Sequence, residues 1–184
     1  NQTLLDIIVI NDEDILQFVR HLDPNKSLGF DGISIRMLKL CDCSVVMPLS
    51  IIFHNCISEG YFPVAWKKGN VTPIHKKKKK LIENYRPMSV LPICGKLLER
   101  IIYNNLYNFL EKNNILNINQ SGFRSSDSCV NQLLSITYKI FHSFNANPSQ
   151  EGRGVFLDIS KAFDKVWHDG LIHKLKCNGI TRNV

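Results

Sequence analysis

The sequence has no long apolar run and little glycine or proline. The longest stretch without Lys, Arg, Asp or Glu lies between Cys43 and Ser58, and it contains Pro48, His54 and Asn55. It falls short of the roughly 18–20 apolar residues that span a bilayer, so we expect no membrane partner. Ten glycines and seven prolines among 184 residues exclude a collagen-like or Pro/Gly-rich fibre. The 44% of apolar residues can build the core of an ordinary domain.

No initiator Met or secretory leader is visible in NQTLLDIIVINDEDI at the N-terminus. We therefore expect the chain to be a piece of a longer polypeptide. Its six cysteines lack the tight spacing of a disulfide-stapled domain, which predicts reduced thiols and an intracellular protein, in the cytoplasm or nucleus.

One group of residues is a candidate metal site: Cys41, Cys43, His54 and Cys56. Because Cys-x-Cys is not the Cys-x2-Cys spacing of common zinc sites, buried structural thiols are the better interpretation.

Positive charge is concentrated in one short region. The chain has 23 basic and 16 acidic residues, a formal net charge of +7. Residues 67–100 hold ten of the basic and two of the acidic side chains, whereas residues 1–66 hold four and eight. Such a basic patch suits a polyanion such as nucleic acid or nucleotide phosphate. For the five lysines 76–80 alone, a solvated loop or a nuclear-import signal explains the run equally well.

Apolar periodicity and capping residues predict a helix-rich first third. Asn11 or Asp12 can cap the first helix, and a loop follows from Pro24 to Gly32. The predicted helices cover about 12–22, 33–40 and 48–58. The segments NVTPIH (70–75) and NYRPMSVLP (84–92) then predict two short strands joined by a basic loop, a finger-like hairpin with an exposed tip.

The second half predicts two further helices and a strand. Apolar residues at helical spacing indicate a helix over 93–112, and Asp127 can cap another that continues to about 144. GVFLDIS predicts a strand over 155–160. In the KAFDKVWHDGLIHKL segment that follows it, one helical face would hold Phe163, Val166, Trp167 and Leu171.

Asp158 would share one face of that strand with Phe156 and Ser160. A carboxylate among apolar neighbours is costly unless its charge is compensated, and a bound Mg²⁺ would compensate it. An aspartate that caps the next helix is the alternative. A phosphatase of the haloacid dehalogenase type is excluded because its second aspartate, two residues on, is Ser160 here.

Four blocks occur in a characteristic order. They are WKKGNVTPIHKK (66–77), NYRPMSVLPICGKLLERII (84–102), QSGFR (120–124) and VFLDISKAFDKVWHDGLIHKL (155–175). Together with KSLGFDGIS (26–34), they resemble the reverse transcriptases of non-long-terminal-repeat retrotransposons, the jockey-like and LINE-type group. A group II intron-type enzyme fits the SKAFDKVWH block less well.

The resemblance implies an α+β right-hand polymerase fold, with a short basic fingers hairpin and an incomplete antiparallel palm sheet. Residues 1–66 would be an N-terminal helical extension, 67–125 the fingers and 126–184 the partial palm. The implied activity is RNA-directed DNA synthesis, in which the primer 3′ hydroxyl attacks the α-phosphate of a dNTP with the help of two Mg²⁺ ions, or Mn²⁺. The implied partners are an RNA template, a DNA primer, dNTPs and the rest of the polymerase polypeptide.

The resemblance also assigns residues at the reaction centre. Asp158 matches the first catalytic aspartate and would bind metal, with the backbone carbonyl of Ile159 beside it. Phe163 matches the steric gate that crowds a ribose 2′ hydroxyl. Arg86 matches the fingers arginine over the triphosphate, where its planar guanidinium can bind two phosphate oxygens.

Further basic residues match positions near phosphate or nucleic acid. Lys76 or Lys77 matches the fingers lysine directed at the outer phosphate. Lys78, Lys79, Lys80 and Arg124 are expected to contact nucleic acid. For Arg124, a surface arginine that pairs with Asp127 is the alternative.

The family takes its other catalytic carboxylates from a Tyr/Phe-x-Asp-Asp turn, and this chain contains no Asp-Asp pair. We therefore expect the isolated chain to bind nucleotide or nucleic acid weakly and not to polymerise. A non-catalytic nucleic-acid-binding remnant of such an element is the alternative.

Overall fold

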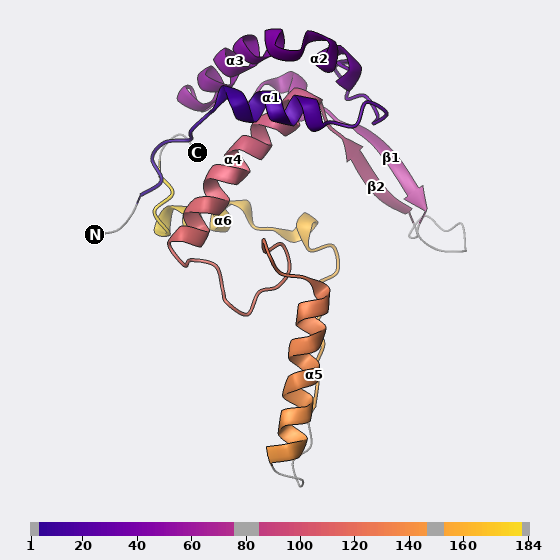
Figure 1. Cartoon of the computed structure of the whole chain (residues 1–184), viewed down its shortest axis with the longest axis vertical. Coiled ribbons are helices and arrows are strands. Elements are labelled where there is room, and N and C mark those ends of the chain that lie inside the picture. The colour runs from indigo at the N-terminus through magenta and orange to yellow at the C-terminus, as the bar shows by residue number, and fades with distance from the viewer. Residues whose placement is uncertain (1–3, 76–84, 147–152, 182–184) are drawn as a thin grey trace. The chain divides into compact units, whose positions relative to one another are not determined.

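The computed structural model describes residues 4–75, 85–146 and 153–181 (Figure 1). Within these ranges the chain is helix-rich, with six α-helices and one two-stranded antiparallel sheet. The described residues form two compact units. The first consists of the described parts of Asn1–Phe109 and Leu175–Val184, and the second of those of Leu110–Lys174.

The first three helices confirm the predicted ranges. α1 covers Asp12–His21 and has three acidic residues in its first turn, where the helix dipole favours negative charge. α2 covers Ile35–Cys41 and begins after Ser34, whose Oγ accepts a hydrogen bond from the backbone N–H of Met37 at 3.1 Å. A 3-10 turn then leads into α3, which covers Val46–Ser58.

α1, α3 and α4 enclose the core of the first unit. α4 covers Ile93–Lys112, the predicted range. Its Leu98 lies in one buried cluster with Val19 of α1 and Phe53 of α3. Phe53 is fully buried, and its ring meets that of Trp66 edge-on with 6.0 Å between the centroids. Burial of apolar surface is the main stabilising contribution to folding, so this cluster holds the first unit together.

The stretch Ile35–Ser58 is long and apolar enough to cross a membrane, judged by length and composition alone. A core helix passes the same test but is mostly buried, whereas 22% of the most apolar window of this stretch is buried. Leu49 and Phe53 of α3 belong to the core cluster. The 3-10 turn Asp42–Val45, in which Asp42 has a φ of 41°, divides the stretch into two helices. The absence of a membrane partner stays a prediction.

β1 and β2 form the predicted hairpin in the first unit (Figure 1). β1 covers Asn70–His75 and β2 covers Tyr85–Val90. The strands pair along their whole length, from Asn70 opposite Val90 at the base of the hairpin. The connecting residues 76–84 lie outside the described residues, so the exposed tip stays a prediction.

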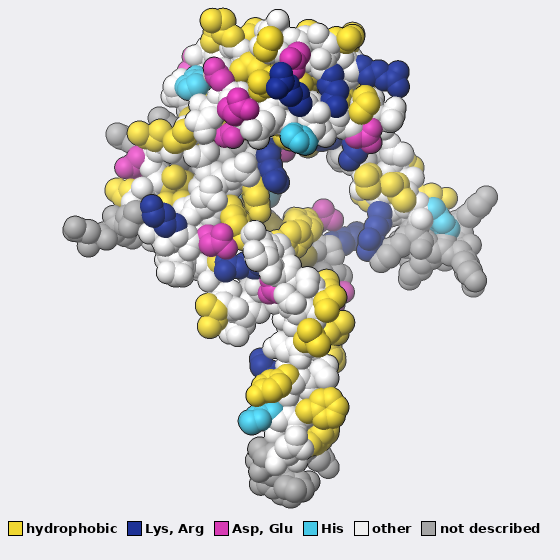
Figure 2. Space-filling model, in the orientation of Figure 1, with side chains coloured by type: hydrophobic (Ala, Val, Ile, Leu, Met, Phe, Trp, Pro, Cys, Tyr) yellow, Lys and Arg dark blue, Asp and Glu magenta, His cyan; other side chains and the backbone are white. Residues whose placement is uncertain are grey.

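α5, which covers Cys129–Ala146, is the long helix of the second unit. The Oγ of Ser128 accepts a hydrogen bond from the backbone N–H of Asn131 at 3.2 Å, so Ser128 caps the helix and the prediction of Asp127 as the cap is wrong. Asp127 instead accepts a hydrogen bond from the backbone N–H of Ser128 at 2.7 Å. In the part of this unit that the structure describes, no apolar side chain is buried, and Figure 2 shows hydrophobic side chains on the surface over α5.

The strand predicted over residues 155–160 does not form. All six side chains are exposed, and the backbone adopts no strand. A strand needs a hydrogen-bonded neighbour, and within the described ranges β1 and β2 pair only with each other. The incomplete palm sheet is therefore not seen among the described residues.

The helix predicted after that segment begins later than expected. Phe163–Lys165 forms a 3-10 turn, and α6 covers His168–Cys177. The carbonyl of Trp167 accepts the first helical hydrogen bond, from the backbone N–H of Leu171 at 3.0 Å. The prediction that Phe163, Val166 and Trp167 share one helical face is therefore wrong, because all three precede α6.

Candidate active site

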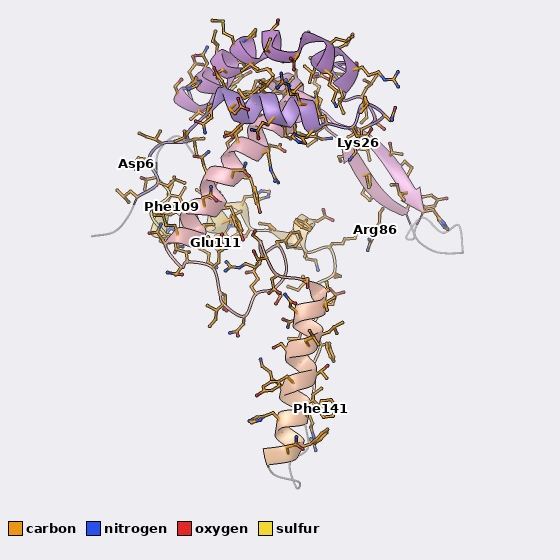
Figure 3. All side chains as sticks on the ribbon, in the orientation of Figure 1. Asp6, Lys26, Arg86, Phe109, Glu111 and Phe141 are labelled. Carbon is orange, nitrogen blue, oxygen red and sulfur yellow. The ribbon has the colours of Figure 1, made fainter. Side chains whose placement is uncertain are left out.

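Arg86 lies on β2 opposite Ile74, one pair from the far end of the hairpin. Alternation along the strands places the Arg86 side chain on the same face as those of Ile74 and Met88. The side chain is exposed, and Figure 3 labels it on the hairpin. In the last pair, the rings of His75 and Tyr85 approach to 5.0 Å. The guanidinium is thus open to an anionic ligand, and its contact with a triphosphate stays a prediction.

The lysines assigned to the outer phosphate and to nucleic acid, Lys76–Lys80, lie outside the described residues. Their roles stay predictions. Lys68, which precedes β1, is described, and its Nζ lies 5.3 Å from the centroid of the Phe30 ring. This distance is typical of a cation–π contact.

Asp158 lies in an exposed segment of the second unit. The flanking side chains of Leu157 and Ile159 are 91% and 70% exposed. Asp158 is exposed as well, so its carboxylate is accessible to a cation from solvent. The alternative role as a helix cap is not supported, because α6 begins ten residues later, at His168.

Phe163 follows Asp158 at the start of the 3-10 turn and is 84% exposed. The turn is closed by the backbone hydrogen bond from the N–H of Val166 to the carbonyl of Phe163 at 3.5 Å, and Nζ of Lys165 donates to Oγ of Ser160 at 3.3 Å. The ring is therefore free to meet a ligand, as a steric gate requires.

Arg124 is more covered than expected. Its side chain is 22% exposed, and its NH2 group lies 3.8 Å from Oε1 of Glu111, near the end of α4. Its NH1 group is buried without a hydrogen-bond partner. Phe123, just before it, has a φ of 59° and a ring that is 89% exposed. The charge of Arg124 also helps to lower the pKa of Asp127, so the alternative of a surface arginine paired with Asp127 stays a prediction.

A polar pocket of about 390 Å³ lies in the same unit, and the sequence reasoning missed it. It is lined by Ile118, Asn119, Ser121, Asp127, Asn131, Gln132, Ser135 and Lys139. The spacing of four between residues 131, 135 and 139 on α5 is the signal that could have indicated it, because residues four apart share one helix face.

Hydrogen-bond donors, of which two contribute most, stabilise the charged form of Asp127 in this pocket. The Ser121 hydroxyl, and after it the backbone N–H of Ser128, lower the pKa of Asp127 below its usual value. The Ser121 hydroxyl also donates a hydrogen bond to Oε1 of Gln132 at 2.6 Å. Asp127 is therefore a fixed negative charge at neutral pH.

No group of three His, Cys, Asp or Glu that could hold a metal ion occurs in the described parts of the chain. Nδ1 of His54 lies 2.8 Å from the carbonyl oxygen of Ser50, one turn earlier on α3. Cys56 is buried, but Cys41 and Cys43 are exposed, so the interpretation as buried thiols is wrong for these two. They lie at the α2 corner, away from the buried faces of the helices.

The described elements carry the sequence blocks of one known family. The family model for reverse transcriptase (RNA-dependent DNA polymerase) matches residues 74–183. This range contains Arg86, Arg124, Asp158 and Phe163. The chain belongs to the reverse transcriptase family.

Three relatives from Drosophila melanogaster indicate which group within this family the chain is similar to. The chain is 36% identical over 177 residues to the probable RNA-directed DNA polymerase from transposon BS. It is 33% identical over 178 residues to the RNA-directed DNA polymerase from mobile element jockey, and 32% over 165 to the probable one from transposon X-element. These alignments cover 95%, 95% and 89% of this chain and 19%, 19% and 18% of the relatives. The predicted resemblance to jockey-like elements is confirmed, and the chain spans about a fifth of these relatives.

Proposed function

We propose that this chain is the fingers and the first part of the palm of an RNA-directed DNA polymerase. Residues 1–66 would be the N-terminal helical extension, 67–125 the fingers and 126–184 the partial palm. The observation that carries the proposal is the alignment with RNA-directed DNA polymerases over 95% of the chain. In the intact parent, the enzyme would add dNTPs to the 3′ end of a DNA primer on an RNA template.

The hairpin would bind the triphosphate. Arg86 is exposed on β2, and its planar guanidinium suits two phosphate oxygens at once. Lys76 or Lys77 would meet the outer phosphate, and Lys78, Lys79 and Lys80 the nucleic acid. Positioning and charge neutralisation supply most of the acceleration in phosphoryl transfer, so these cations would act by both means.

Asp158 would contribute one ligand to a magnesium site, with the carbonyl of Ile159 as a second oxygen. Both are hard donors of the kind that Mg²⁺ prefers. The described residues add no further carboxylate cluster, so a complete site needs carboxylates that lie outside them. When bound, such ions stabilise the attacking and leaving oxygens of the displacement.

Phe163 and Arg124 would shape the site around the nucleotide. The exposed Phe163 ring would exclude a ribose 2′ hydroxyl and so favour dNTPs. Arg124 carries a buried NH1 group that has no acceptor. An unsatisfied buried donor costs free energy, so a phosphate or base oxygen that reached it would be bound favourably.

Primer extension tests the proposal. The polypeptide that includes the downstream-encoded sequence is compared with its Asp158→Asn variant, on an RNA template with Mg²⁺. We expect Asp158→Asn to lower the rate at least about 100-fold, since changes around metal sites cost this much or more. Asp164→Asn is the matched control, because it removes the same charge from the same exposed segment and should retain activity.

The isolated 184-residue chain should bind a primer–template weakly and extend no primer. Measurable extension by this chain would contradict the requirement for further carboxylates. If the longer polypeptide were inactive but still bound nucleic acid, the alternative of a non-catalytic remnant would be favoured.

A further inference from the structure

Gly29, in the loop before α2, lies directly against the segment that joins β2 to α4. A Cβ atom at position 29 would lie 2.5 Å from Cα and 2.8 Å from N of Pro92. Both are backbone atoms that a side-chain rotation cannot move. Pro92 is fully buried, so the backbone at this contact has no free space on that side. Only glycine fits position 29 without displacing Pro92.

The same loop also contacts the segment that precedes β1, at the same base of the hairpin. Phe30 holds its ring 5.3 Å from Nζ of Lys68, two residues before β1 begins. Residues 26–34, here named the base loop, therefore meet the chain both before β1 and after β2. Figure 3 labels Lys26 in this loop and Arg86 farther along the hairpin.

Asp31 fixes the base loop internally and faces the start of α4. Its Oδ1 accepts a hydrogen bond from the backbone N–H of Ile33 at 3.2 Å, and its Oδ2 is buried without a partner. Burial, and after it the charge of Asp31, raises the pKa of Cys94 in the first turn of α4 to about 11. The base loop is thus seated against both the hairpin and the helix that follows it.

We propose that the base loop clamps the foot of the β1–β2 hairpin, and that Gly29 is thereby a positioning residue for Arg86. The inference rests on the proposed function of Arg86 in triphosphate binding. None of the base-loop residues need touch the nucleotide, because they act through the hairpin.

A small change in orientation at the foot of the hairpin displaces residues farther along it by a larger distance. Arg86 lies four register pairs from the Asn70–Val90 pair at the base, a span of about 13 Å at roughly 3.3 Å per residue. A tilt of about 10° at the foot would therefore move Arg86 by about 2 Å. Misplacement of a positioning group by about 1 Å can cost about 100-fold in rate, so the clamp matters for function.

Amide hydrogen exchange on the 184-residue chain tests the clamp. In Gly29→Ala we expect the β1 and β2 ladder amides to exchange at least about tenfold faster, while those of α1 and α3 stay within about twofold. Gly60→Ala, outside the base loop, is the matched control. Gly60 has a φ of 63°, and a Cβ there would meet nothing within 4 Å, so its substitution strains the backbone without acting on the base loop or Pro92. It should leave the hairpin amides unchanged.

Binding of inorganic tripolyphosphate, measured by calorimetry, tests the link to Arg86 in a double-mutant cycle. We expect Gly29→Ala to weaken binding in the wild-type background and to have no further effect in Arg86→Ala, because both changes remove the same contact. A purely structural role of Gly29 would give additive losses instead.

Unchanged exchange of the hairpin amides in Gly29→Ala would overturn the clamp. Additive losses of tripolyphosphate affinity would overturn the positioning of Arg86. If Arg86→Ala bound like the wild type while Gly29→Ala still loosened the hairpin, the error would lie in the proposed role of Arg86, and the positioning role of Gly29 would fall with it.

Discussion

Arg20 of α1 donates two hydrogen bonds to the carboxylate of Asp42, from Nε to Oδ1 at 2.8 Å and from NH2 to Oδ2 at 2.9 Å. The pair ties α1 to the corner between α2 and α3. Asp42 itself has a φ of 41°, a conformation that few residues other than glycine, asparagine and aspartate adopt. Both side chains are about half exposed, so the pair fixes geometry more than it adds stability.

Asp42→Asn should lower the thermal unfolding midpoint at pH 7. The hydrogen bond and charge of Arg20 lower the pKa of Asp42. The stabilisation is therefore present above the ordinary aspartate value of about 3.9 and is lost as the pH falls through the lowered pKa. We expect the difference between the wild type and the variant to shrink as the pH falls below about 3.9. Asp164→Asn is the control, and a difference that grew as the pH fell would contradict the assignment.

Phe53→Ala should destabilise the first unit by about 3–5 kcal/mol, because it removes a buried ring and leaves a cavity. Phe53 is fully buried and contacts Trp66 edge-on. Leu40 is 87% exposed, so Leu40→Ala should change the free energy of unfolding by no more than about 0.5 kcal/mol. Urea unfolding followed by tryptophan fluorescence measures both, and equal losses would show that the buried cluster is wrongly placed.

The thiol of Cys94 should react far more slowly than those of Cys41 and Cys43. Burial raises the pKa of Cys94 to about 11, and the thiolate is the reactive form. At pH 8 the smaller thiolate fraction alone predicts that Cys94 reacts roughly 100-fold more slowly than an ordinary exposed thiol. Iodoacetamide labelling with peptide mass spectrometry checks this. Labelling in urea, where the difference should vanish, is the control.

Phe163→Ala should weaken the preference for dNTPs over rNTPs in the polymerase that contains this chain. Removing the ring would admit a 2′ hydroxyl, and we expect the dNTP preference to fall by about 10- to 200-fold, the range of a single pocket contact. Incorporation of a dNTP and its matching rNTP on one template measures the ratio. Trp167→Ala removes another exposed ring in the same unit and should leave the ratio unchanged.

Local patterns predicted most of the helices and the hairpin. The ranges of α1 and α4 follow from apolar residues at helical spacing, which act between near neighbours in the chain. Asn11 lies at the predicted N-cap position of α1, but its side chain makes no capping hydrogen bond. The hairpin follows from two short segments whose prolines disfavour helix. The base loop was missed as a clamp, because the contact between Gly29 and Pro92 joins residues far apart in sequence.

The segment around Asp158 marks the limit of such patterns. The run GVFLDIS predicted a strand over 155–160, yet the strand does not form, because pairing depends on a neighbour that the local sequence cannot supply. The position of Arg124 is a similar case. Its motif predicted contact with nucleic acid or with Asp127, but could not indicate that its NH2 group also lies 3.8 Å from Oε1 of Glu111, near the end of α4.

The sequence by itself determined the family and the positions of the candidate reaction-centre residues. It also determined the helical and hairpin segments. All of these depend on residues that lie close together along the chain. Only the tertiary structure decided that the base loop meets the foot of the hairpin and that the NH1 group of Arg124 is buried without an acceptor. Those contacts arise from packing between segments distant in sequence. Shape complementarity and the exclusion of water determine which segments pack together.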